Sequence, residues 1–237
     1  MKTEIKLSNR LKMVASYLPK GTFFADIGSD HAYLPCYICL KDETSRAIAG
    51  EVREGPYKRA LETVEAYQLT NKVEVRLGNG LDIINYDDGV KELVIAGMGG
   101  SLISQIIESG KEKLTTVNRL ILQPNNAAHL VRKLLLELGY SLTHEGILEE
   151  NNHIYEIIVA DKIKNEQSQW DPTEMEKQLL FGPILMKEKS PVFFKKWKME
   201  KRKLIKVIHQ MKNAKNIDYE KLAQYETQLK WMEEILS

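Results

Sequence analysis

The sequence predicts an α/β fold: a seven-stranded, mostly parallel sheet ends in an antiparallel hairpin and is followed by an α-helical coiled-coil domain. Short β-branched runs alternate with helix-length amphipathic patterns over the first 138 residues, and a hairpin pattern follows them. A lysine-rich region with helical spacing closes the chain. With 237 residues, 43% of them hydrophobic, the chain can bury a large core together with a small module.

The N-terminal region predicts a helix, because apolar residues recur at helical spacing from Leu7 to Leu18 and Ser8 is a suitable cap. A Pro-Lys-Gly run at 19–21 ends that helix. The strands predicted after it are 23–27, 46–51, 73–77, 93–96 and 120–123. The helices predicted to connect them are 31–41, 54–69, 99–113 and 126–138. The runs 140–148 and 154–160 then predict the hairpin.

The polar, unpatterned segment 161–171 predicts a linker between two domains, residues 1–161 and residues 172–237. Two apolar stripes beyond it predict a pair of long helices that run antiparallel around a polar break at 213–218. The stripes are Phe193, Trp197, Leu204, Ile208 and Met211, then Leu222, Tyr225, Leu229, Met232 and Leu236.

The positive charge is concentrated in the tail, although the formal net charge of the chain is only +1. Residues 187–215 hold eleven Lys and Arg against two Glu, which indicates a polyanion partner such as RNA. The alternative is a solvated helix face. The basic residues expected to contact RNA are Lys195, Lys196, Lys198, Lys201, Arg202 and Lys203.

Several classes of protein are disfavoured. No apolar run approaches the ~20 residues that a membrane span needs, and the polar N-terminus does not resemble a signal peptide, so a cytoplasmic protein is expected. Cys36 and Cys39 have CxxC spacing, but no second cysteine pair or close histidine pair completes a zinc site. We therefore expect no metal and a structural role for both cysteines. A monomer is the default expectation.

The ends of the first two strands predict a cofactor site, since ligands of open parallel sheets bind at the carboxyl ends of the strands. Asp26, Gly28, Ser29 and His31 surround the first turn, which lacks the second and third glycines of a GxGxxG dinucleotide fingerprint. A cofactor without a pyrophosphate fits better. S-adenosylmethionine needs acceptors for its ammonium and ribose hydroxyls, and Glu51 ends the second strand where a ribose-binding carboxylate is expected.

The third and fourth strand ends extend this site. Asn79 and Gly80 can read an adenine edge while Leu81 packs on the ring, although an ordinary turn would have the same sequence. The further cofactor contacts expected on the second and fourth strands are Val52, Ala96 and Gly97.

The expected methyl-transfer position is lined by backbone, because Gly97 and the two glycines after Met98 leave few side chains there. A ring nitrogen such as adenine N1 already holds a lone pair, so attack on the methyl group demands positioning above all. Gln123 and Asn125 offer amides for a base edge, and a helix cap is the alternative for Asn125.

Asp30 and His31 are expected at the same opening as catalytic residues that orient the base or the cofactor amino group. Asp30 also stands where a helix prefers an N-cap, so both roles remain open for it. A carboxylate such as Asp26 or Asp30 could stabilise the positive charge that develops on the methylated adenine.

Together the motifs resemble the bacterial tRNA (adenine-N1)-methyltransferase family called TrmK. They are ADIGSDHAYLP (25–35), AGEVREGP (49–56), GNGL (78–81), IAGMGG (95–100), LILQPN (120–125), HIYEIIVA (153–160), FGPILMKEK (181–189) and FFKKW (193–197). The resemblance implies a Rossmann-like class I methyltransferase with a C-terminal coiled coil. It also implies an enzyme that uses S-adenosyl-L-methionine to form N1-methyladenosine at position 22 of tRNA.

Two other functions remain as alternatives. A small-molecule methyltransferase could use the basic helices for dimerisation, and a non-catalytic RNA-binding module could keep the sheet domain without its chemistry. Salt sensitivity separates the first alternative from an RNA enzyme, because capture of RNA by several lysines weakens steeply as salt rises. Cofactor binding argues against the second alternative.

Overall fold

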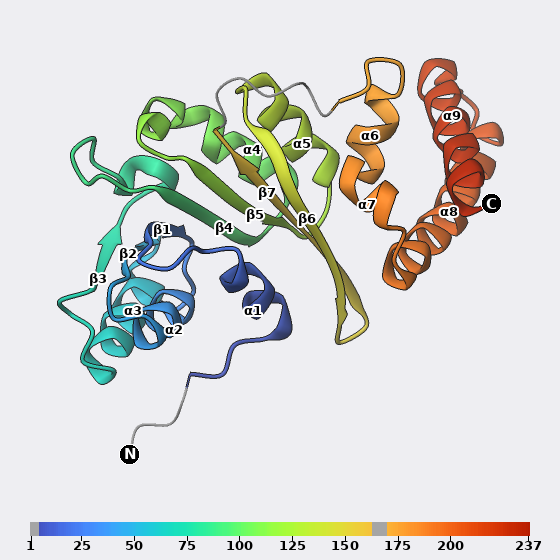
Figure 1. Ribbon diagram of the computed structural model, residues 1–237. Helices are drawn as coiled ribbons and strands as arrows, with labels where there is room; N and C mark the ends of the chain where they lie inside the picture. Colours follow the sequence, from blue (N-terminus) through green and yellow to red (C-terminus); the bar gives the residue numbers. More distant parts are fainter. Residues whose placement is uncertain (1–4, 163–169) are drawn as a thin grey trace.

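The computed structural model describes residues 5–162 and 170–237, and its centre is a single sheet (Figure 1). The strand order is β3-β2-β1-β4-β5-β7-β6, with β1 to β5 parallel and β7 antiparallel to both of its neighbours. Because the order reverses between β1 and β4, a ligand crevice is expected at their carboxyl ends. The strands are β1 (Phe23–Ile27), β2 (Arg46–Glu51), β3 (Val73–Leu77), β4 (Glu92–Met98), β5 (Arg119–Pro124), β6 (Ser141–Glu150) and β7 (His153–Asp161).

Helices cover both faces of the sheet. On one face α1, α2 and α3 share a buried cluster that contains Val14, Cys36 and Val64, and on the other face α4 and α5 bury Ile103 and Val131. These helices are α1 (Asn9–Ser16), α2 (Tyr33–Lys41), α3 (Glu54–Ala66), α4 (Gly100–Ser109) and α5 (Ala128–Glu137), with the 3-10 turns η1 (Gly80–Ile83) and η2 (Lys111–Thr115).

The predicted sheet is confirmed. The first three strands have the predicted bounds, and β4, β5 and β7 extend one or two residues beyond the predicted ends because pairing continues beyond their apolar cores. β6 begins one residue later and ends two residues later than predicted. The cap is also confirmed, since the Ser8 hydroxyl accepts a hydrogen bond from the Leu11 amide at 3.2 Å. The prediction of one continuous helix over 99–113 is wrong, because the chain breaks at Gly110 into the helix α4 and the 3-10 turn η2.

The tail forms four helices, α6 (Met175–Phe181), α7 (Pro183–Glu188), α8 (Pro191–Lys212) and α9 (Tyr219–Leu236). Ion pairs join Lys201 to Glu233 and Lys212 to Glu226, so α8 and α9 run antiparallel as predicted. We call this pair the helical hairpin; its coiled-coil packing remains a prediction. The predicted linker 161–171 lies mostly outside the described residues, and the two domain limits likewise remain predictions.

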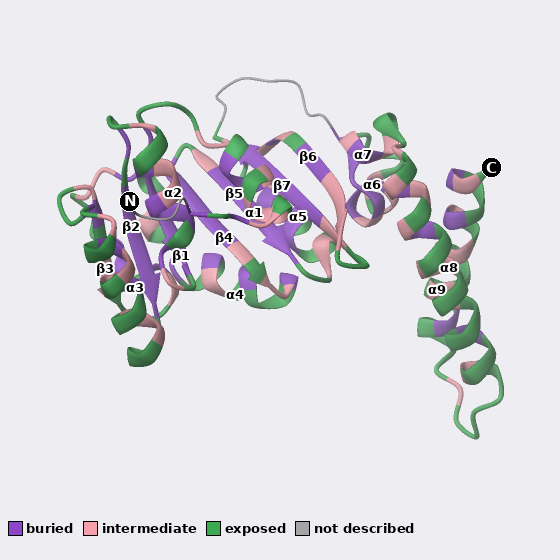
Figure 2. Cartoon of the chain, turned by 90° about the horizontal axis from the view of Figure 1, so that it is seen from below, coloured by how far each residue is buried: buried purple, intermediate pink, exposed green. Residues whose placement is uncertain are grey.

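Burial differs sharply between the sheet and the hairpin (Figure 2). The strands are largely buried, whereas α8 and α9 bury a small cluster near α6 and α7 and become mostly exposed toward the loop that joins them. Phe181, Phe193 and Trp197 meet Met232 and Ile235 in that cluster. Within residues 5–162 and 170–237, no helix combines the length and apolarity needed to cross a membrane.

A buried ion network connects the hairpin and α6–α7 to the sheet. Arg132 of α5 has no exposed surface and donates to Glu145 of β6 and Glu156 of β7, both at 2.6 Å. Glu145 also accepts a hydrogen bond from the Ile184 amide of α7 at 2.9 Å, and Glu156 pairs with Lys196 of α8. Arg132 Nη1 also donates to the Leu179 carbonyl of α6 at 3.2 Å, so six elements (α5, α6, α7, α8, β6 and β7) meet around this guanidinium and its two carboxylate partners. A buried charge of this kind is tolerated only when its partners satisfy it.

Gly182, between α6 and α7, lies directly against this network. Its φ is +87°, and a Cβ added there would lie 2.6 Å from both Arg132 Nη2 and Glu145 Oε1. Gly139 provides a matched comparison, because its φ is +73° and an added Cβ would meet nothing within 4 Å. Both positions favour glycine because of their positive φ, but only position 182 also lacks the space for a side chain.

We expect Gly139→Ala to lose roughly 1–2 kcal/mol of stability from backbone strain. Gly182→Ala should lose roughly 1–3 kcal/mol more, because the new methyl group also overpacks the ion network. Urea unfolding of both variants and of the unmodified protein measures the difference. Equal losses for the two variants would show that the close approach at Gly182 carries no energetic weight.

Candidate active site

The turn after β1 holds a buried carboxylate. Asp26 is 4% exposed, and its carboxylate accepts a hydrogen bond from the Ser29 hydroxyl at 2.6 Å. Burial, together with the nearby carboxylates of Glu51 and Asp30, raises the pKa of Asp26 to about 7, and the hydrogen bond from Ser29 opposes this shift. Gly28 has a φ of +69°, and a Cβ there would collide with the Met98 side chain, so the turn requires glycine.

The backbone after this turn corrects the expected helix start. Asp30, His31 and Ala32 have φ values of 47°, 70° and 57°, which no right-handed helix accommodates, so α2 begins at Tyr33. Ala32 is the N-cap residue and makes no side-chain cap bond. The capping role considered for Asp30 is therefore wrong. The Asp30 side chain is 87% exposed and lies 3.4 Å from Nε2 of His31, at the opening of the crevice.

Glu51 ends β2 with an unused acceptor. The residue is 6% exposed, and its Oε1 atom is buried without a hydrogen-bond partner. Burial raises the pKa of Glu51, while hydrogen bonds from the Asp30 and His31 backbone amides oppose that shift. An unpartnered buried carboxylate oxygen is costly, and a hydroxyl donor from a ligand would remove the cost. Val52 follows with an exposed side chain.

The loop after β3 borders a small pocket of about 130 Å³. Asn79, Gly80 and Leu81 line one side of it, and Leu81 is also buried against the core. The other side comes from α4, whose contribution the sequence did not reveal. Apolar periodicity predicts which face of a helix is buried, but it does not predict that Leu102, Gln105 and Ile106 face this loop.

A closed chain of hydrogen bonds joins the ends of β4 and β5. The Gln123 Oε1 atom accepts from Arg10 Nη1 at 2.5 Å and from the Gly97 amide at 2.9 Å. Gln123 Nε2 then donates to Asn125 Oδ1 at 3.1 Å, and Asn125 Nδ2 donates to the Gly97 carbonyl at 2.8 Å. Ala96 precedes this arrangement at the end of the buried part of β4.

These bonds change the roles expected for the two amides. Gln123 has no exposed surface and both ends of its amide are engaged, so the direct contact with a base edge predicted for it is wrong in this arrangement. Asn125 is exposed and keeps one N–H free of these bonds. The capping alternative for Asn125 is also wrong, because Ala127 is the N-cap residue of α5.

Arg10 is the site residue that sequence reasoning missed. It lies on α1, about 113 positions from Gln123 in the chain, and its guanidinium lies 3.4 Å from the position a Gly97 Cβ would take. The amides of Asn9 and Arg10 donate to the Glu150 carboxylate of β6, which fixes the start of α1 against the sheet. A lone arginine in an amphipathic helix gives no sequence signal for such a contact.

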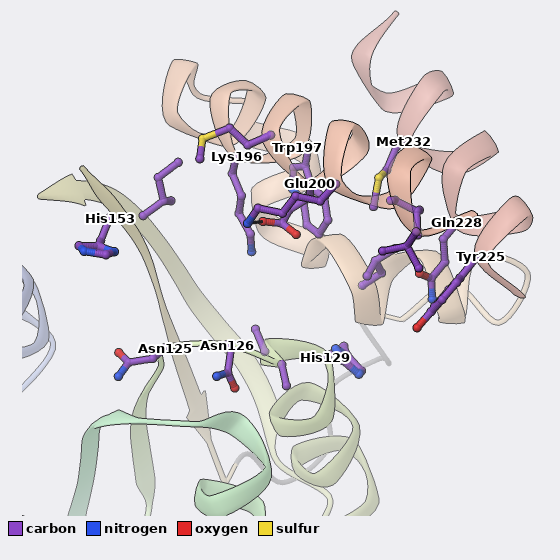
Figure 3. Close-up of a pocket in the computed structure, with 18 of the residues that line it drawn as sticks. Asn125, Asn126, His129, His153, Lys196, Trp197, Glu200, Tyr225, Gln228 and Met232 are labelled. Carbon is purple, nitrogen blue, oxygen red and sulfur yellow. Dashed lines mark hydrogen bonds and ion pairs between the residues drawn. The ribbon is translucent and has the colours of Figure 1, made fainter. Parts of the chain in front are cut away.

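A large cleft of about 650 Å³ opens beside these strand ends (Figure 3). One wall is the turn before α5 and the turn between β6 and β7, with Asn125, Asn126 and His153. The opposite wall is the helical hairpin, with Trp197, Tyr225 and other side chains directed toward the cleft. Asn125, at one edge of the predicted site, therefore lines the same cavity as Lys196 and Lys203 of the basic tail.

The basic residues of α8 divide into two groups. Lys195, Lys196, Lys201 and Lys203 make ion pairs with Glu149, Glu156, Glu233 and Glu200. Lys196 is half-buried, so the prediction of an outward-facing lysine is wrong there because Glu156 draws the ammonium toward the sheet. Lys198 and Arg202 are exposed and have no ion pair with any residue in the described ranges.

The two cysteines, the remaining candidates for metal or thiol chemistry, lie in the protein interior. Cys36 and Cys39 are buried in α2, and burial raises the pKa of the Cys36 thiol to about 12 and that of Cys39 to about 11. Such thiols stay protonated at neutral pH and are poor nucleophiles or metal ligands. Across residues 5–162 and 170–237, no three His, Cys, Asp or Glu side chains form a group able to hold a metal ion.

Comparison with known proteins identifies the family. The family model for tRNA (adenine(22)-N(1))-methyltransferase, TrmK, matches residues 24–234. The Bacillus subtilis tRNA (adenine(22)-N(1))-methyltransferase is 44% identical over 218 residues, 92% of this chain and 91% of the relative. The crystal structure of B. subtilis TrmK superposes with a TM-score of 0.91 at 40% identity, covering 99% of this chain and all of that one.

Two other solved relatives contain the cofactor or its product. A Streptococcus pneumoniae relative, solved with S-adenosyl-L-methionine, has a TM-score of 0.84 at 40% identity and covers 98% of this chain and 100% of that one. Mycoplasma capricolum TrmK, solved with S-adenosyl-homocysteine, has a TM-score of 0.81 at 26% identity, with 97% of each chain covered. With its strand order, its glycine-lined crevice and its basic hairpin, the chain belongs to the TrmK family of tRNA (adenine(22)-N(1))-methyltransferases.

Proposed function

We propose that this chain transfers the methyl group of S-adenosyl-L-methionine to N1 of adenosine 22 in tRNA, using the crevice at the ends of β1 to β5. The observation that carries the site assignment is the buried, unpartnered Oε1 atom of Glu51. It fits a ribose hydroxyl, and the chain's membership in the methyltransferase family supports S-adenosyl-L-methionine as the source of that ribose. Relatives solved with this cofactor or with S-adenosyl-homocysteine support the same reading.

Residues at the ends of β1 to β4 bind different parts of the cofactor. Asp26 and Ser29 face the charged amino-acid end, with the Gly28 turn allowing close approach and the His31 backbone beside it. Glu51 and Val52 hold the ribose, and Asn79, Gly80 and Leu81 border the pocket expected to take the adenine. Ala96 and Gly97 lie beneath the reacting centre. When bound, the cofactor supplies a methyl group activated by its sulfonium.

The reaction depends on placement of the acceptor. Adenine N1 carries a lone pair at neutral pH, so no general base is required and proximity supplies most of the rate. The Arg10–Gln123 pair fixes the Gly97 backbone, and the free N–H of Asn125 is available to a base edge. Asp30, exposed beside His31, offers a carboxylate to the cationic product ring.

The basic hairpin completes the proposal as the surface that holds folded tRNA. Lys198 and Arg202 can reach phosphates directly, while Lys195, Lys201 and Lys203 would exchange a carboxylate partner for a phosphate. Lys196 serves instead as a link to Glu156. In this proposal residues 1–161 form the methyltransferase domain and residues 172–237 form the RNA-binding domain. The enzyme is a monomer and lies in the cytoplasm with its substrate.

The decisive experiment compares two tRNA transcripts, one with adenosine at position 22 and one with guanosine there. We expect label from the methyl group of S-adenosyl-L-methionine to enter only the first transcript. Equal labelling of both would keep the enzyme class and discard the site. No labelling of either, with cofactor still bound, would favour a small-molecule methyltransferase with a dimerising hairpin.

Binding of S-adenosyl-L-methionine should depend on Asp26 protonation. The raised pKa keeps Asp26 mostly neutral below pH 7, and the cationic cofactor favours the ionised form, so affinity should increase as pH rises through about 7. Between pH 6 and pH 8 we expect Kd to fall about tenfold. Calorimetry on the unmodified protein and on Asp26→Asn measures this change. A step retained in Asp26→Asn would assign the titration to another group.

Glu51→Gln should weaken S-adenosyl-L-methionine binding by roughly 10- to 150-fold, because hydrogen bonds to a charged acceptor contribute about 1.5–3 kcal/mol. Glu54→Gln is the matched control, since Glu54 is an exposed glutamate three residues later. The dissociation constants of both variants are measured by calorimetry at pH 8. Unchanged binding in Glu51→Gln would remove the ribose role.

A further inference from the structure

The large cleft between the hairpin and the strand ends has an apolar wall that intramolecular packing does not use. Met199 and Val207 line the cleft from α8, with 40% and 37% of their surface exposed. Most of the other exposed side chains of α8 are polar or basic, and Ile205 is a further exposed apolar residue that lies outside the cleft. Leu204, between Met199 and Val207, is partly covered by the cluster at the base of the hairpin. An apolar surface that faces a cavity of this size suggests a ligand.

Polar groups around this wall suit a nucleobase. Asn126, Tyr225 and Gln228 line the cleft and offer donors and acceptors that can match a base edge (Figure 3). Unstacked RNA bases are recognised by this combination, an apolar or aromatic surface for the ring and amides for its edge. Lys203 borders the same cleft, where a sugar-phosphate backbone would lie.

One residue of the cleft wall, Asn125, contacts the proposed methyl-transfer position. Asn125 lines the cleft and, through its side-chain amide, donates to the Gly97 carbonyl at 2.8 Å. A target adenosine at Gly97 therefore places the neighbouring nucleotide of the same strand near the cleft opening. Extrusion of a base from a helix also disrupts the stacking of its neighbour, which then needs a new surface.

We propose that this cleft binds one nucleobase adjacent to the target adenosine, stacking it on Met199 and Val207 and contacting its edge from Asn126 and Gln228. The proposal rests on the proposed function and adds a second base-binding site to it. The cleft would then hold the RNA strand beside the reacting base, while the exposed basic residues of α8 hold phosphates farther away.

The test pairs protein variants with altered transcripts. Val207→Asp places a carboxylate in the cleft, and Ile205→Asp is its control, because Ile205 is 45% exposed on the same helix and does not line the cleft. Three transcripts with adenosine at position 22 are compared: intact, abasic at position 21, and abasic at position 23. The kcat/KM for each transcript is measured at saturating S-adenosyl-L-methionine, after melting curves show that every protein and RNA is folded.

If the proposal is right, one of the abasic transcripts reacts roughly 5- to 150-fold less well with the unmodified enzyme, the range expected for loss of one stacked base. Ile205→Asp should show the same loss. Val207→Asp should be impaired on the intact transcript and show little further loss on that abasic transcript. Met199→Asp provides a second cleft variant if Val207→Asp is unstable.

Independent effects of Val207→Asp and the abasic site, or no effect of either abasic site, would overturn the proposal. Equal impairment by Val207→Asp and Ile205→Asp would also overturn it, and would assign the loss to charge alone. Failure of the proposed function is separately visible, because the unmodified enzyme would then not label the intact transcript.

Discussion

The position of the hairpin depends on the buried guanidinium of Arg132. It donates to Glu145 of β6 and Glu156 of β7. Those carboxylates in turn bind the start of α7 and Lys196 of α8. Removing one partner would leave an uncompensated charge in the interior, which is strongly destabilising. The cleft exists because this network holds the helical hairpin at a distance from the strand ends, rather than collapsed onto them.

The site itself separates two physical tasks. On the cofactor side, burial raises the pKa of both Asp26 and Glu51 and leaves Glu51 Oε1 without a hydrogen-bond partner, so a cationic, hydroxyl-bearing ligand has energy to gain there. On the acceptor side, Gly97 and its neighbours offer no acid or base, and a chain of hydrogen bonds from Arg10 makes the backbone rigid. Such a division suits an acceptor that is nucleophilic without deprotonation.

Most of the fold follows from local pattern. Strands such as 46–51 are short and have an apolar centre between polar ends, so their bounds could be predicted, and Glu51 could be placed because strand ends share one edge. Three features could not be predicted. The positive φ values at Asp30 to Ala32 depend on tertiary packing, Arg10 meets Gln123 across most of the domain, and Gln123 is buried by partners that are distant in the chain. Periodicity carries no information about such pairs.

The connection between hairpin and sheet also has a geometric meaning. Buried ion pairs fix the helical hairpin to the sheet. The distance from the exposed basic surface of α8 to the Gly97 backbone is therefore established before any RNA arrives. The protein therefore fixes the distance between its RNA-binding surface and its methyl-transfer position. An RNA is accepted when an adenine lies at the matching distance from a phosphate-rich surface, so overall shape, more than neighbouring sequence, would select the substrate.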